Sequence, residues 1–164
     1  MKLSAAGKLT NVQEALDDYR KVQLLNDPSA PYSLVDPELK QAVALLNEQP
    51  GVMTTDCCAS HHEEGKTKKQ FYCAFFVTEE GLDFLADLVM TFTGFVSGNP
   101  HIDSLVSQIH LKHRLRLVAR EFQHVGHVWT ITVPSHTPIT AAFLASCFTE
   151  AVEHVIKDRG AGSL

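Results

Sequence analysis

The amino-acid sequence predicts a single α+β domain in which helices pack on a mixed or antiparallel sheet. Segments with strand-like patterns come in two pairs, and each pair precedes a segment with helical spacing of apolar residues. The chain has 164 residues, 45% of them apolar, which is enough for one hydrophobic core. We therefore expect two strand-strand-helix halves in one domain.

Residues 1–31 are expected to form a peripheral helix and a linker, ahead of the core domain at 32–160. Apolar residues recur there at helical spacing, at Val12, Ala15, Leu16, Tyr19 and Val22. Pro28 and Pro31 stop the helix because proline lacks the backbone N–H that a helix interior needs. The tail at 161–164 is expected to fray.

The first half of the core domain begins with a short helix. Asp36 followed by Pro37 is typical of a helix N-cap and first turn, and the buried face would carry Leu39, Ala42, Val43 and Leu46. A strand is expected from Val52 to about Cys57, followed by a polar loop at 61–69. In the segment Phe71 to Val77 the side chains expected on each of the two faces of a strand are apolar, which predicts a central strand covered on both faces.

A second helix follows this central strand. Thr78 is a candidate N-cap, and Glu79 and Glu80 suit the positive end of the helix dipole. The expected core face consists of Leu82, Leu85, Leu88, Val89 and Phe92. The segment from Gly94 to Pro100 is expected to close this half.

The second half repeats the same order. Residues 111–122 alternate strictly and predict a half-exposed strand, and residues 125–133 predict its partner. Thr137 and Pro138 then begin a last helix, whose expected core face is Leu144, Phe148, Ala151, Val152 and Val155. The segments 71–78 and 127–134 resemble each other in pattern, and each precedes a helix.

Charge and composition narrow the classes of function. Lys and Arg number 14 and Asp and Glu 19, for a net charge of −5, so no global positive field favours nucleic acid as a partner. No apolar stretch approaches a membrane span and no signal segment is recognisable, so we expect a cytoplasmic protein that makes no membrane contact. Nine histidines indicate pH-dependent solubility or assembly, with a homo-oligomer as one expected form.

The segment from Thr54 to His62 is the most distinctive. Thiols and imidazoles are typical zinc ligands, which makes zinc a candidate cofactor at Cys57, Cys58, His61, His62 and Cys73. Neighbouring cysteines on a strand face opposite sides, so only one of Cys57 and Cys58 can serve the same centre. Two alternatives stay open: a buried apolar cysteine beside solvated histidines, and a reactive Cys58 thiol beside His61.

Two further groups of side chains lie on the strands of the second half. His113 and His127 are expected in the same layer, either as hydrogen-bonded core histidines or as the lining of a polar pocket. Lys112, Arg114, Arg116 and Arg120 share the other strand face at intervals of roughly 7 Å. Such a spacing suits two phosphates, or a carboxylate and a phosphate, and it equally suits a solvated sheet edge.

The run from Asp36 to His61 resembles the opening of the wybutosine-synthesis methyltransferase family, and also resembles short uncharacterised bacterial and phage-encoded proteins. In that family a helix ending in Leu/Ile-Asn precedes a strand and a Thr-Thr-Ser-Ser-Cys-Ser-Gly-Arg motif. Thr54, Thr55 and Cys58 match this motif, whereas the five residues Asp56, Cys57, Ala59, Ser60 and His61 depart from it. The resemblance implies transfer of a methyl group from S-adenosylmethionine to RNA.

Two functions are therefore expected from the sequence. The first is a small cytoplasmic domain, of the phage-encoded kind, that binds an anionic small molecule such as a nucleotide. Its candidate ligand-binding residues are Thr54, Thr55, Asp56, Cys58, His61, His113, Arg114, Arg116 and His127. The alternative is an S-adenosylmethionine-dependent RNA methyltransferase of the wybutosine-synthesis type. The acidic net charge favours the first.

Overall fold

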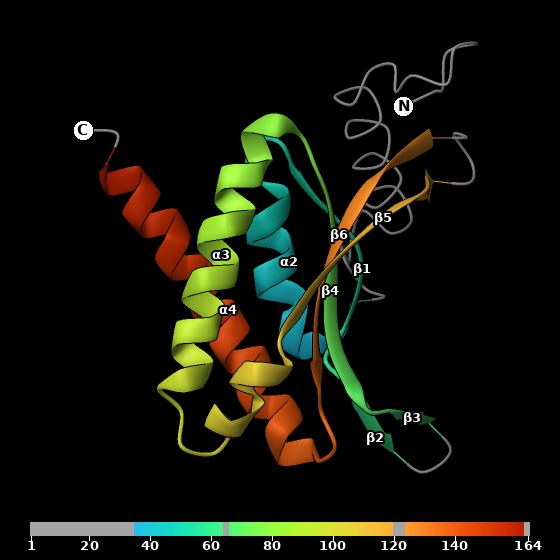
Figure 1. Cartoon of the computed structure of the whole chain (residues 1–164), viewed down its shortest axis with the longest axis vertical. Helices are drawn as coiled ribbons and strands as arrows, with labels where there is room; N and C mark the ends of the chain where they lie inside the picture. Colours follow the sequence, from blue (N-terminus) through green and yellow to red (C-terminus); the bar gives the residue numbers. More distant parts are fainter. Residues whose placement is uncertain (1–34, 64–65, 120–123, 163–164) are drawn as a thin grey trace.

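The computed structural model describes residues 35–63, 66–119 and 124–162 and shows an α+β domain (Figure 1). The helix and linker expected at 1–31 lie outside these residues. The helical elements are η1 (Pro37–Leu39), α2 (Lys40–Asn47), α3 (Glu79–Ser97), η2 (Asp103–Gln108) and α4 (Pro138–Ala161). The strands are β1 (Val52–Cys58), β2 (His61–Glu63), β3 (Lys66–Lys68), β4 (Gln70–Val77), β5 (His110–Ala119) and β6 (His124–Pro134).

The main sheet is antiparallel, with strand order β1-β4-β6-β5. The helices α2, α3 and α4 lie together on one side of it (Figure 1). The two expected halves are β1-β4-α3 and β5-β6-α4, and they meet where β4 pairs with β6, from Gln70 opposite Pro134 to Phe76 opposite Val128. The α+β class is therefore confirmed.

Aromatic side chains form the centre of the core between the sheet and the helices. The Phe148 ring centroid lies 5.4 Å from those of both Phe71 and Phe92, and the ring planes make angles of 61° and 88°. Edge-to-face contacts of this kind add to the stabilisation from area burial. Along β4, Phe71 and residues 73–77 are all buried, which confirms a central strand covered on both faces.

Local capping contacts fix where the two long helices begin. The Thr78 hydroxyl accepts a hydrogen bond from the Gly81 N–H, and Thr137 and Thr140 form a reciprocal capping box on either side of Pro138. Gly51 precedes β1 with a φ of +70°, and a Cβ there would lie 2.1 Å from the Thr78 hydroxyl. Only glycine fits this position, which holds the start of β1 against the start of α3.

Among the described helices, α4 is the one long and apolar enough to cross a membrane by length and composition. One face of α4 is packed in the domain core, where Leu144, Phe148 and Val152 are completely buried and Val155 nearly so. This is the composition expected of a central helix that packs against both a sheet and other helices.

Four details differ from the sequence-based expectation. Leu82 is 41% exposed, and Phe84 takes its place in the core. Helix α3 continues past Gly94 to Ser97. Residues 61–69 include a short antiparallel hairpin of β2 and β3 rather than only a loop, because backbone pairing needs no apolar pattern. Residues 111–114 on edge strand β5 are exposed on both faces and not half-exposed as expected, because β5 contacts chiefly its neighbour β6 rather than the helices.

Candidate metal site

A β-bulge decides which way the two neighbouring cysteines face. The pairing of β1 with β4 shifts between Thr54 and Asp56. Side chains after this bulge therefore point to the sheet face opposite to the one that uninterrupted alternation predicts. Cys57 then lies opposite Cys73 and packs against the core between sheet and helices. Cys58 lies opposite Tyr72 on the other face, where it is 2% exposed.

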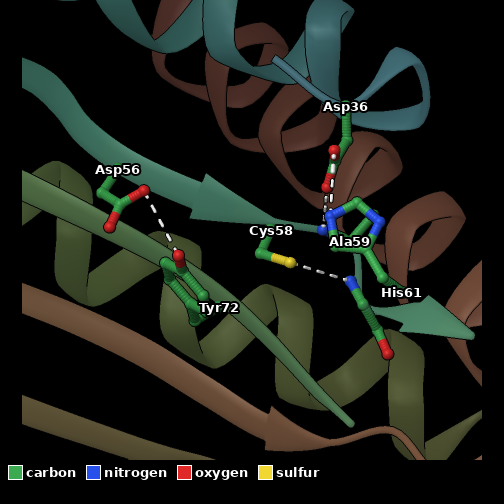
Figure 2. Close-up of polar contacts among 7 residues, drawn as sticks. Asp36, Asp56, Cys58, Ala59, His61 and Tyr72 are labelled. Atoms are coloured by element: carbon green, nitrogen blue, oxygen red, sulfur yellow. Dashed lines mark hydrogen bonds and ion pairs between the residues drawn. The ribbon is translucent and has the colours of Figure 1, made fainter. Parts of the chain in front are cut away.

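A tight turn follows Cys58 and brings His61 back towards it. Ser60 at the centre of this turn has a φ of +81°, and it is the one non-glycine residue with positive φ in the described part of the chain. Its backbone N–H donates to Cys58 Sγ at 3.4 Å (Figure 2). This bond orients the Cys58 sulfur, as outer hydrogen bonds orient metal ligands in proteins.

Asp36 completes the cluster from the entrance to η1. It occupies the N-cap position, as expected, but its side chain makes no capping hydrogen bond there. Instead Oδ2 accepts the Ala59 N–H at 2.7 Å, and Oδ1 lies 3.5 Å from His61 Nε2 (Figure 2). The carboxylate therefore holds the Cys58–His61 turn and presents its second oxygen to the imidazole.

The ligand atoms of Asp36, Cys58 and His61 all lie within 4.8 Å of one another. Zinc bonds of about 2.0–2.3 Å place the donor atoms of a tetrahedral centre roughly 3.3–3.7 Å apart, so small side-chain movements suffice for all three to reach one ion. Carboxylate, thiolate and imidazole are the three zinc-binding groups of proteins. The site is half-open, because the side chains of His61 and Asp36 are 38% and 19% exposed.

The other expected metal ligands lie elsewhere. Cys57 and Cys73 face each other across β1 and β4 on the core side of the sheet, and neither is in a disulfide. Burial and the nearby Asp36 and Asp56 carboxylates raise the pKa of Cys57 to about 12, and burial raises the pKa of Cys73 well above its ordinary value. Their position on the core side of the sheet keeps both thiols out of the Asp36 cluster.

His62 belongs to a neighbouring hydrogen-bond network rather than to the cluster. Its Nε2 lies 2.9 Å from the Ser60 hydroxyl, which in turn donates to the Ser135 carbonyl at 3.3 Å. This network ties the turn to the segment between β6 and α4. It also borders a pocket of about 290 Å³, lined by Glu38, Ala59, Ser60, His62, Pro138, Ala141 and Ala142.

The candidate ligand-binding residues on β1 have separate environments. Thr54 is 2% exposed and bonds to Asn47, whose Nδ2 donates to the Thr54 hydroxyl at 3.0 Å and whose Oδ1 accepts the Thr54 N–H at 2.8 Å. This pair links the end of α2 to β1. Thr55 lies at the bulge and is half-buried, and Asp56 is exposed and accepts a hydrogen bond from the Tyr72 hydroxyl.

The candidates on the second pair of strands are not brought to this cluster by any described contact. His113 is exposed on edge strand β5 and stacks on Trp129 with ring centroids 4.4 Å apart, so it is neither a core histidine nor part of a closed pocket. Lys112 and Arg114 are exposed, which fits a solvated edge. The side chains of Arg116 and His127, and the whole of Arg120, lie outside the described residues.

Sequence reasoning missed Asp36 as a member of the site. Its one signal was the Asp-Pro pair, which predicts a helix start and was interpreted as a cap alone. Comparison with protein-family models, with curated proteins and with solved structures finds no match for this chain. The geometry of the described residues therefore carries the functional argument.

Proposed function

We propose that this protein is a small metal-binding domain that holds one zinc ion through Asp36, Cys58 and His61. The observation that carries this proposal is the convergence of three different zinc-binding groups within 4.8 Å of one another. Two backbone hydrogen bonds support it by holding the thiol and the carboxylate in place. Outer hydrogen bonds of this kind orient metal ligands in proteins.

Three protein ligands leave a fourth tetrahedral position for water or an added ligand. A thiolate and a carboxylate together cancel the charge of Zn²⁺, so the centre has no net charge to attract a polyanion from a distance. We propose that the fourth position takes a small oxygen anion, such as a carboxylate or a phosphate group, by direct coordination. Of the anionic small molecules expected from the sequence, those that offer a single unhindered oxygen to the zinc ion would then bind.

The test is metal content and Co²⁺ spectroscopy on the full chain. We expect one zinc per chain, and a Co²⁺-loaded form with the visible bands of a four-coordinate centre and a thiolate charge-transfer band. Asp36→Asn, Cys58→Ser and His61→Gln should each lower metal affinity by more than the roughly 10- to 100-fold that loss of an outer hydrogen-bond partner costs. Each variant has a matched control next to the site: Asp56→Asn, Cys57→Ala and His62→Gln.

Two results would contradict the metal proposal. One is less than about 0.1 zinc per chain after purification with added zinc, because a three-ligand site should fill under those conditions. The other is equal loss of metal in the ligand variants and in their controls. Acetate, phosphate and a mononucleotide should perturb the Co²⁺ bands, whereas metal-independent binding of S-adenosylmethionine would favour the methyltransferase alternative.

A further inference from the structure

A groove of about 530 Å³ lies between the C-terminal part of α3 and the middle of α4. Figure 1 shows the two helices side by side, and they are in direct contact. The lining residues are Gly94, Phe95, Gly98, Asn99, Pro100, His101, Phe143, Ser146, Cys147 and Glu150. None of them belongs to the Asp36 site, so the groove is a separate feature.

Aromatic rings form much of the apolar wall. His101 and Phe143 stack face to face, with ring centroids 4.6 Å apart and an angle of 7° between the planes. Phe95 is half-buried and contacts His154 edge-on at 5.6 Å. A flat ring in the groove can therefore extend an existing stack of rings.

The α3 side of the groove has room for such a ring. Gly94 is exposed in the last turns of α3, and a Cβ built on it would meet no other atom within 4 Å. Glycine at this position weakens the helix by about 1 kcal/mol relative to alanine. The open space in front of it is where a ligand can approach the helix backbone.

One carboxylate sets the charge of the groove. Glu150 is exposed, and the Ser146 hydroxyl donates to its Oε1 at 3.3 Å. With histidine neutral, Glu150 is the one charged residue among the described residues that line the groove. Asn99 adds an amide, whose Nδ2 donates to Cys147 Sγ at 3.9 Å.

We propose that this groove binds a planar aromatic cation, an aromatic ring that carries an amidinium or ammonium group. The ring stacks beside His101 and Phe143, and the cationic group lies against Glu150. Aromatic faces attract cations as well as flat rings, and the carboxylate adds a charge-assisted hydrogen bond. An anion of the same shape meets Glu150, and the described residues that line the groove include no Lys or Arg to compensate for this repulsion.

The probes are benzamidine, benzamide and benzoate, which have nearly the same shape and carry charges of +1, 0 and −1. Binding is followed by amide chemical shifts in an NMR titration of the full chain, because fragments of this size bind on the order of millimolar. We expect shifts around Phe143 and Glu150 and a Kd for benzamidine about three- to tenfold lower than for benzamide. Benzoate should not bind.

Two variants test the groove, each with a matched control. Glu150→Gln should raise the Kd for benzamidine to that for benzamide, whereas Glu153→Gln, on the next turn of α4, should not change it. Gly94→Leu should fill the groove and weaken all binding at least tenfold. Gly160→Leu is its control, since a Cβ at Gly160 also meets no atom within 4 Å. Circular dichroism checks that each variant is folded.

Three outcomes would overturn the proposal. The first is no saturable shift with benzamidine up to about 20 mM, well above the expected millimolar range. The second is benzoate binding as tightly as benzamidine, which would remove the role of Glu150. The third is unchanged binding in Gly94→Leu, which would place the probe elsewhere on the protein.

Discussion

The buried pair of Asn47 and Thr54 tests directly whether the centre of β1 stabilises the fold or contacts a ligand. Thr54→Val keeps the shape of the side chain but removes the hydroxyl that accepts from Asn47 Nδ2 at 3.0 Å. The Thr54 N–H keeps its bond to Asn47 Oδ1, so one half of the contact survives. Loss of one partner of a buried polar group costs about 1–3 kcal/mol.

This magnitude predicts a lower midpoint of unfolding for Thr54→Val. For a chain of this size, each kcal/mol lowers Tm by about 2–4 °C. The assay is urea and thermal unfolding of both proteins, followed by circular dichroism, together with metal content. We expect lower stability with unchanged zinc stoichiometry, because the Thr54 hydroxyl bonds to Asn47 and not to Asp36, Cys58 or His61.

A double-mutant cycle separates the hydrogen bond from general packing. In an Asn47→Leu background the Thr54 hydroxyl has already lost its amide partner, so adding Thr54→Val should cost about 1 kcal/mol less than it does alone. Equal costs in both backgrounds would refute the coupling. Unchanged stability with loss of anion binding would refute the reasoning altogether and return Thr54 to a ligand-binding role.

Two other predictions concern the core and the buried thiols. Phe148→Ala should lower the free energy of unfolding in urea by about 3–5 kcal/mol, because Phe148 is fully buried among Phe71, Phe75 and Phe92. The control is Met90→Ala, at a residue that is 76% exposed, which should change the free energy of unfolding by less than about 0.5 kcal/mol. Similar effects of the two substitutions would contradict this packing. Burial raises the pKa of Cys57 from 9.0 to about 12. Between these two pH values the folded protein retains a proton on Cys57 that the unfolded chain loses, so the free energy of unfolding should fall as pH rises above 9. Urea midpoints across this range should decline less in Cys57→Ala, and an identical decline would argue against a buried protonated thiol.

Local sequence patterns were enough to predict most of the regular elements. The apolar run from Phe71 to Val77 and the caps at Thr78 and Thr137 depend on neighbouring residues alone, and the structure confirms them. The same periodicity gives the direction of a buried helix face but not its width, which is why Leu82 was assigned to the core. The β2–β3 hairpin has no apolar pattern to reveal it.

The sequence by itself determined the fold class and part of the site. Cys58 and His61 are three residues apart in the sequence, which made them candidates for one site, and the turn at Ser60 brings their ligand atoms together. Asp36 lies 22 residues before Cys58, and only the packing of η1 and α2 against β1 brings its carboxylate to the turn. No local pattern contains that contact.

The choice between the two neighbouring cysteines also belongs to the tertiary structure. Uninterrupted alternation from Val52 on the core face would place Cys58 on that face and Cys57 on the other. The bulge between Thr54 and Asp56 reverses this, so Cys57 pairs with Cys73 in the core and Cys58 faces the site. Composition fixed which ligand types were present, but the register of β1 against β4, set by cross-strand packing, decided which thiol can reach a metal.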